Sequence, residues 1–249
     1  MKRLNVLPLL ILLLSAAAPV TSEARPVLQV QAETPEARPL TPKDVARLHS
    51  AAELAIRPDG SAIAYTLSVP RTPGRGENGA AWAPLHMVTF DAGDDRTFVG
   101  GEVNVSHLRW SPDGRFLGYL ARRPGDDHVS IYVIPAEAGE SVRLYQHETS
   151  IQAFDWRPDG RAIAFVATEA LPAEVSELRE KGFDQEVYEE DWQSRRLYVL
   201  DLPGGPAGEA GSAAMIEVPG QPWHVVWGPE GKRLLTDLSP TPLIDDRYM

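Results

Sequence analysis

Two adjacent glutamates, Glu189 and Glu190, are the residues with the clearest potential for chemistry, because Tyr188, Asp191 and Trp192 flank them. Carboxylates beside aromatic rings can bind a cationic group, such as the free amino terminus of a peptide, through charge-assisted hydrogen bonds and cation–π contacts. The alternative is that the same residues form a solvated acidic edge that leads into the next strand. The residue types alone favour the acidic edge and leave amino-terminus binding open.

Other chemistries lack the residue patterns that they need. No serine lies in a Gly-x-Ser-x-Gly elbow, so we expect no serine-hydrolase triad in these 249 residues. The six histidines have no metal-ligand spacing and there is no cysteine, which excludes thiol catalysis and disulfides. We therefore expect no metal and no other cofactor. With 24 basic against 35 acidic residues and no basic cluster, nucleic acid is not an expected partner.

A sequence that is repeated four times along the chain indicates the secondary structure around these residues. In each copy an apolar residue stands four positions before a proline, and an aromatic residue or Ile stands two positions before it. The proline fits the second position of a type I turn, the acidic residue satisfies local backbone donors, and the glycine accepts a left-handed conformation. Each copy therefore predicts a β-hairpin, and the four copies are 54–60, 108–114, 154–160 and 225–231.

A second repeated pattern follows the first three turns. It consists of a large apolar residue, a small residue and an aromatic residue, in the triplets Ile63-Ala64-Tyr65, Leu117-Gly118-Tyr119 and Ile163-Ala164-Phe165. Such strands are apolar on both faces and must be buried on both sides. We predict an all-β fold, a partial β-propeller of about four PD40-type blades, because a sandwich, the alternative, has no reason to repeat the same turn and triplet.

The turn prolines are 54, 46 and 71 residues apart, so the third blade contains an insertion. We assign it to residues 169–195, which are highly charged and have helical periodicity. Pro172 is expected at the first helical position and Gly182 after the last. Only one strand, expected at 233–238, follows the fourth turn, so we expect the fourth blade to be incomplete and the chain to be a fragment.

The amino-terminal segment has the features of an export signal. Lys2 and Arg3 precede an apolar run, 4–14, and small residues follow to Ala24. The run is shorter than the ~20 residues that span a bilayer, so no stable membrane anchor is expected. We predict a signal peptide over 1–24, a linker over 25–40 and the propeller over 41–249, in an exported protein, periplasmic or secreted.

A short helix is expected to open the propeller region. Thr41 and Asp44 form a capping-box pattern around Pro42, which suits the first helical position.

In combination these features resemble the amino-terminal propeller of the prolyl oligopeptidase family, most closely its acylaminoacyl-peptidase and dipeptidyl-peptidase branch. The resemblance covers about residues 40–249. It rests on the Trp-Ser/Arg-Pro-Asp-Gly strands after a signal peptide, the opening 40–44, the run Tyr188-Glu189-Glu190-Asp191-Trp192, the stretch 195–199 and the end 239–249.

The resemblance implies a substrate-gating propeller that precedes an α/β-hydrolase domain with a Ser-Asp-His triad and admits only short peptides. Peptide substrates and the hydrolase domain, which is absent from this chain, are thus the expected partners, and the chain alone is expected to be inactive. Glu189 and Glu190 would match the glutamates that bind the substrate's amino terminus. That branch has Asp-Trp before the Tyr-Glu-Glu run, whereas here Asp191-Trp192 follows it.

The alternative from another functional class is a non-enzymatic periplasmic propeller resembling TolB, acting as a protein-interaction module. Such a chain would place a whole α/β domain between the signal and the propeller, where only about twenty residues intervene here.

Overall fold

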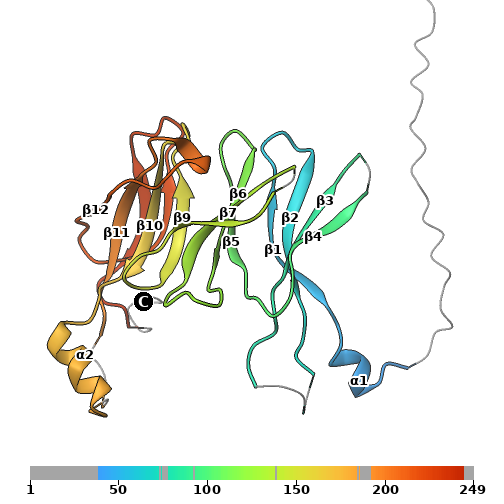
Figure 1. The fold of residues 1–249 in the computed structure, drawn as a ribbon, viewed down its shortest axis with the longest axis horizontal. Helices are drawn as coiled ribbons and strands as arrows, with labels where there is room; N and C mark the ends of the chain where they lie inside the picture. The colour runs from blue at the N-terminus through green and yellow to red at the C-terminus, as the bar shows by residue number, and fades with distance from the viewer. Residues whose placement is uncertain are drawn as a thin grey trace, which may run out of the picture. The chain divides into compact units, whose positions relative to one another are not determined.

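The computed structural model describes residues 39–72, 74, 78–91, 93–137, 139–183, 185 and 192–243. The predicted signal peptide therefore lies outside the described residues. From Thr41 onward the chain forms one compact unit, and its described part is nearly all β (Figure 1). None of the helices in that part is long and apolar enough to cross a membrane.

The strands form antiparallel sheets in chain order, which we call blades 1 to 4. Blade 1 contains β1 (Ser50–Ile56), β2 (Ala62–Ser68), β3 (Leu85–Thr89) and β4 (Asp95–Val99). Blade 2 contains β5 (Ser106–Trp110), β6 (Phe116–Ala121), β7 (Ser130–Pro135) and β8 (Val142–Tyr145). Blade 3 contains β9 (Ile151–Trp156), β10 (Ala162–Thr168), β11 (Arg195–Asp201) and β12 (Ala213–Ile216). Blade 4 is the pair β13 (Gln221–Trp227) and β14 (Leu234–Ser239).

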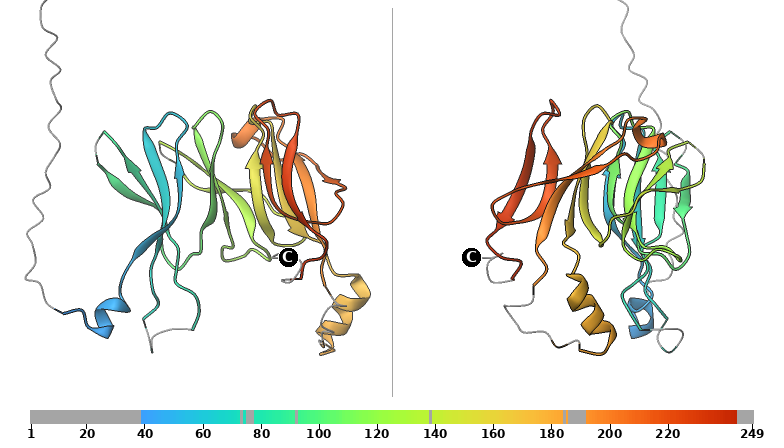
Figure 2. Two further views of the ribbon diagram at one scale, coloured as in Figure 1. Left: turned by 180° about the vertical axis from the view of Figure 1, so that it is seen from behind. Right: turned by 60° about the vertical axis from the view of Figure 1, so that its left-hand side comes forward.

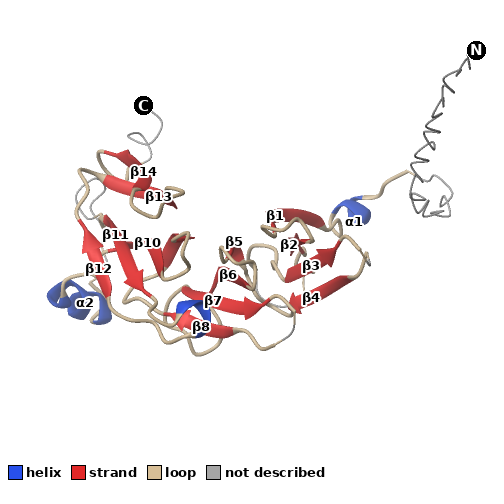
Figure 3. Cartoon of the chain, turned by 90° about the horizontal axis from the view of Figure 1, so that it is seen from above, coloured by secondary structure: helices blue, strands red, loops and turns tan. Residues whose placement is uncertain are grey.

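The blades lie side by side in the order of the sequence. The first strands of successive blades contact one another, β1 with β5, β5 with β9 and β9 with β13. Figure 3 shows β1, β5 and β13 on the inner side of the curve that the blades follow, and β4 and β8 on the outer side. The predicted fold class, a partial β-propeller, is confirmed, and the described sheets do not close a ring.

The four repeated turns join the first two strands of each blade, as predicted. Gly60, Gly114, Gly160 and Gly231 have φ between 66° and 73°, and each donates its N–H to the carbonyl three residues before it. The carboxylate of Asp59 accepts from the Ser61 N–H at 2.9 Å, and that of Asp159 accepts from the Arg161 N–H at the same distance. The proline, the acidic residue and the glycine thus act as the sequence suggested.

Alternate residues of the second strands pack against opposite neighbours. In β6, Leu117 and Tyr119 join the core between blades 1 and 2, whereas Leu120 joins the core between blades 2 and 3. In β10, Phe165 faces blade 2 and Val166 belongs to the core with blade 4. The period of two residues along a strand therefore builds two interfaces from one sequence.

The small residue of the triplet makes room for the next blade. A Cβ added to Gly118 would lie 3.0 Å from the Trp156 ring and 3.1 Å from the Phe154 ring. These aromatic side chains of β9 therefore pack directly on the backbone of β6. A larger residue at 118 would push blade 3 away from blade 2.

The expectation that these strands are buried on both sides is wrong for blade 1. Ile63 and Tyr65 of β2 are only partly buried, and Leu54 and Ile56 of β1 are 64% and 59% exposed. The reason is that no described blade covers this face. Val226 and Leu235 of blade 4 are likewise exposed, at 49% and 74%.

The two α-helices begin and end near the capping residues that the sequence indicated. Helix α1 (Pro42–Val45) has the predicted capping box between Thr41 and Asp44. Helix α2 (Ala173–Glu180) lies between β10 and β11 and extends beyond the strands of blade 3 (Figure 2). Pro172 is its N-cap and not its first residue, because its ψ of 141° is extended. Gly182, with φ of 88°, follows the helix end as predicted.

A tryptophan in the repeated sequence couples blade 2 to blade 1 and blade 3 to blade 2. The indole Nε1–H of Trp110 donates to the carbonyl of Ala55 at 3.0 Å, and that of Trp156 donates to the carbonyl of Arg109 at 3.1 Å. Both acceptors stand three residues before a turn proline. At the equivalent position of blade 4, the buried Nε1 of Trp227 has no partner among the described residues.

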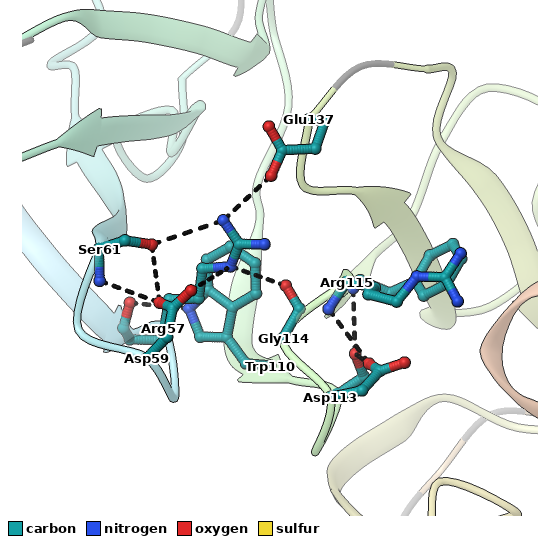
Figure 4. Close-up of polar contacts among 11 residues, drawn as sticks. Arg57, Asp59, Ser61, Trp110, Asp113, Gly114, Arg115 and Glu137 are labelled. Carbon is teal, nitrogen blue, oxygen red and sulfur yellow. Dashed lines mark hydrogen bonds and ion pairs between the residues drawn. The ribbon is translucent and has the colours of Figure 1, made fainter.

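Arginine adds a second contact between blades 1 and 2 (Figure 4). The Arg57 Nε–H donates to the carbonyl of Gly114 at 2.9 Å, and a terminal nitrogen pairs with Glu137 at 3.1 Å. The guanidinium carbon lies 5.8 Å from the centre of the Trp110 ring. The turn of one blade is thus held against the turn of the next.

Removing the indole donor is expected to weaken the interface between blades 2 and 3. Trp156→Phe loses the hydrogen bond to Arg109 but keeps most of the ring, and should lower the free energy of unfolding by about 1–2 kcal/mol. Trp156→Ala should cost about 3–5 kcal/mol. Urea unfolding measures both, and Trp192→Phe, at a side chain 43% exposed, is the control. An equal loss at both tryptophans would contradict the coupling role.

Candidate functional site

Polar side chains of the first strands form a row, which we call the inner-strand row: Glu53, His107, Arg109, Asp155 and His224. They lie on β1, β5, β9 and β13, the strands on the inner side of the curve in Figure 3. In a propeller this side surrounds the central channel. The inner-strand row is therefore the candidate site at which the described part of the chain meets a ligand.

Irregular pairing in these strands gives the row its geometry. The register shifts between Ala51 and Leu54 in β1, between Ser106 and Arg109 in β5, and between Pro222 and Val225 in β13. A β-bulge re-aims the side chains at the shift, here those of Glu53, His107 and His224. His107 has φ of 55°, a value that residues other than glycine rarely adopt.

Glu53 and His107 connect three successive blades. The Glu53 carboxylate accepts the backbone N–H groups of His107 and Leu108, at 2.5 and 3.3 Å. The Nε2 atom of His107 lies 2.8 Å from the carbonyl oxygen and 3.0 Å from the amide nitrogen of Phe154. One tautomer satisfies the carbonyl and the other satisfies the N–H. Side chains of one blade therefore bind the backbone of the next blade directly.

Asp155 makes the corresponding contact between blades 3 and 4. Its carboxylate accepts the backbone N–H of Trp227 at 2.7 Å and lies 4.0 Å from the Arg109 Nε. Burial raises the pKa of Asp155, while the Trp227 hydrogen bond and the Arg109 charge oppose that rise. Asp155 thus accepts a hydrogen bond from blade 4 while its carboxylate is partly shielded from water.

His224 has its partner within blade 4. Its Nδ1 lies 3.0 Å from the carboxylate of Asp237 on β14, and this carboxylate also accepts the backbone N–H of His224 at 2.7 Å. Burial acts to raise the pKa of Asp237, but the hydrogen bonds from His224 prevail and lower it. The side chains of His224 and Arg109 are 62% and 44% exposed, so both can contact a molecule on the inner side.

Glu189 and Glu190 lie outside the described residues. The described residues around them show how the two ends of the insertion meet: the Glu169 N–H donates to the Ser194 carbonyl at 2.8 Å, and the Arg196 Nε–H donates to the Glu169 carboxylate at 2.8 Å. Helix α2 has no buried residue. The insertion is thus anchored at the ends of β10 and β11.

Sequence reasoning missed the inner-strand row, although the sequence carries a sign of it. Glu53, His107 and His224 stand five residues before a turn proline, and Arg109 and Asp155 stand three before it. Charged or polar residues at fixed places in otherwise apolar strands indicate a specific contact. Within the described residues, no group of three or more His, Asp or Glu side chains could hold a metal ion.

Comparisons with known proteins identify the fold. No family model and no curated protein matches the sequence. Among solved structures, the chain is similar to the AtxE2 isopeptidase, with 21% identity and a TM-score of 0.52 over 73% of this chain and 32% of that one.

Two other structures share the fold. One, from a study of two prolyl endopeptidases, has 13% identity and a TM-score of 0.50 over 77% of this chain and 26% of that one. The other, hydrazine synthase of Kuenenia stuttgartiensis, has 17% identity and a TM-score of 0.50 over 75% of this chain and 49% of that one. The chain thus spans about a third or less of the peptidases, and the similarity establishes the fold alone.

The position of His107 predicts a pH-dependent stability. Burial, with the nearby Arg109 charge, lowers its pKa to about 4, against about 6.5 in an unfolded chain. Between pH 4 and 6.5 the unfolded state binds more protons than the folded state. The contribution of neutral His107 to the free energy of unfolding is therefore complete above about pH 6.5 and is lost as the pH falls toward 4. The loss should be about 3 kcal/mol.

His107→Asn, which tolerates the positive φ, should flatten this dependence in urea unfolding between pH 4 and 7. His49→Asn, at an exposed histidine outside the row, should leave it unchanged. A profile that is the same for wild type and His107→Asn would show that another group causes the pH dependence.

Proposed function

We propose that residues 41–249 form the substrate-gating propeller portion of an exported serine peptidase that cleaves short peptides. The observation that carries the proposal is the propeller fold, similar over about three quarters of the chain to the AtxE2 isopeptidase and a prolyl endopeptidase. The repeated turns and the charged insertion support it by their resemblance to the prolyl oligopeptidase family. These 249 residues contain no Gly-x-Ser-x-Gly motif, and the proposal assigns catalysis to an α/β-hydrolase domain outside them.

Hydrazine synthase, which shares the fold, shows that the fold does not determine the chemistry. The inner side of the blades favours gating. Arg109 and His224 are exposed there, and Glu53 and Asp155 link neighbouring first strands by hydrogen bonds to the backbone. A rigid ring of blades would exclude folded proteins and admit extended peptides. The alternative, a TolB-like interaction module, would need no hydrolase domain.

The coding sequence beyond the Met249 codon tests the proposal directly. We expect it to encode an α/β-hydrolase domain with a Gly-x-Ser-x-Gly elbow. A serine-directed fluorophosphonate probe should label the longer product at that serine and should leave residues 1–249 alone unlabelled. Labelling of the 249-residue chain would refute the assignment. A gene that encodes no hydrolase domain would also refute it and would favour an interaction module.

We further propose that Glu189 and Glu190 bind the substrate's amino terminus in the longer protein. Two carboxylates that face an ammonium form charge-assisted hydrogen bonds of about 1.5–3 kcal/mol each. Glu189→Gln and Glu190→Gln should therefore lower kcat/KM roughly 10- to 150-fold for dipeptide substrates with a free amino group. Amino-blocked substrates should be cleaved as before.

Glu174→Gln is the matched control, because Glu174 lies on helix α2 of the same insertion. This variant should leave kcat/KM unchanged for both the free-amino and the amino-blocked substrates. If all three variants cleave free-amino substrates like the wild type, the two glutamates are a solvated edge.

A further inference from the structure

A cleft of about 750 Å³ lies between the outer parts of blades 1 and 2. Phe98 and Val99 at the end of β4 line it from blade 1, and Ile134 of β7 lines it from blade 2. Arg122 and Arg123, which follow β6, supply its positive charge. We call this site the arginine cleft, and it is separate from both the inner-strand row and the insertion.

The two guanidinium groups of the arginine cleft are held by neutral acceptors. Arg123 donates to the Tyr119 hydroxyl and, at 3.5 Å, to the Ser141 carbonyl. Its guanidinium carbon lies 4.3 Å from the centre of the Tyr132 ring. Arg122 donates through Nε to the Asp126 carbonyl at 3.2 Å. Both side chains are thus fixed in place without the loss of their charge.

Among the described residues, no carboxylate lies within 4.0 Å of the guanidinium group of Arg122 or Arg123. Neither arginine therefore forms an ion pair there. Most other arginines of the blades pair with a carboxylate. Arg143, close by, binds the Asp126 carboxylate at 2.6 Å, and Arg96 pairs with Asp94 at 3.2 Å. The protein has a net charge of −11, yet within its described residues these two neighbouring arginines have no carboxylate partner.

The composition of the arginine cleft defines the class of ligand. Guanidinium forks bind carboxylates in a bidentate manner, and Phe98, Val99 and Ile134 can cover an apolar group next to the charge. Glu102 and Glu140 also line the cleft, so its formal charge is zero. A second negative charge on the ligand would face these glutamates, which disfavours a phosphate dianion.

We propose that the arginine cleft binds a monocarboxylate attached to an apolar group, the carboxylate on Arg122 and Arg123 and the apolar group against Phe98 and Val99. A peptide with a free carboxyl terminus and a fatty acid both have this chemistry. The proposal does not depend on the proposed peptidase function, because none of these residues belongs to the inner-strand row.

Isothermal titration calorimetry of the 249-residue chain at pH 7 tests the site with four probes: N-acetyl-Ala-Phe, its carboxyl-terminal amide, octanoate and inorganic phosphate. We expect saturable binding of the free acid, binding of the amide at least ten-fold weaker, and no competition by equimolar phosphate. Octanoate distinguishes the sources, since tighter binding of octanoate points to a fatty acid and tighter binding of the dipeptide points to a peptide terminus.

Arg122→Gln should weaken binding of the free acid about ten-fold, and Arg123→Lys, which keeps the charge but loses the fork, should weaken it less. Arg96→Gln on β4 is the matched control and should bind like the wild type, because its side chain, 58% exposed, pairs with Asp94. Thermal unfolding of each variant checks that the blades remain folded.

Equal affinity of the wild type for the acid and the amide would overturn the proposal without any variant. Displacement of the acid by equimolar phosphate would also overturn it, since it would indicate a general anion site. An equal loss of affinity in Arg96→Gln and Arg122→Gln would overturn it as well.

Discussion

The structure depends on the packing of one apolar blade face against the next, fixed in register by the indole hydrogen bond of Trp110 or Trp156 to the preceding blade. Each blade is apolar on both faces, so a sheet alone would leave a large apolar area in water. The hydrogen bond adds direction to this burial, because a buried indole N–H without an acceptor is costly. In blade 4 the Trp227 indole has no acceptor among the residues that the structure describes, and the Asp155 carboxylate binds the Trp227 backbone N–H.

Both candidate sites arise from this blade-to-blade contact. The inner-strand row consists of side chains that leave one first strand and bind the backbone of the next, as Glu53 does with His107. The arginine cleft is lined by the end of β4 and the segment after it from blade 1, and by β7 and the segments before and after it from blade 2. Polar groups gather at the inner and outer ends of an interface because its middle is filled by residues such as Leu108 and Tyr119.

The fold limits what the chain can do but does not select one activity. Propellers of this kind occur in an isopeptidase, in a prolyl endopeptidase and in hydrazine synthase. The candidate functional groups of this chain are carried on that scaffold. These are the charged insertion between β10 and β11, the exposed Arg109 and His224, and the two arginines of the outer cleft.

Local structure could be predicted from the residues alone. The proline, acidic residue and glycine of each turn, the triplet around Gly118 and the capping box at Thr41 act within a few residues, so their spacing predicts hairpins, blades and helix α1. The sequence did not reveal that Glu53 contacts His107, 54 positions away. Nor did it reveal that Arg122 and Arg123 have no carboxylate partner in the described part of the chain. These contacts emerge only in the three-dimensional fold, because they depend on which strands of different blades come together and which charges that packing leaves unpaired.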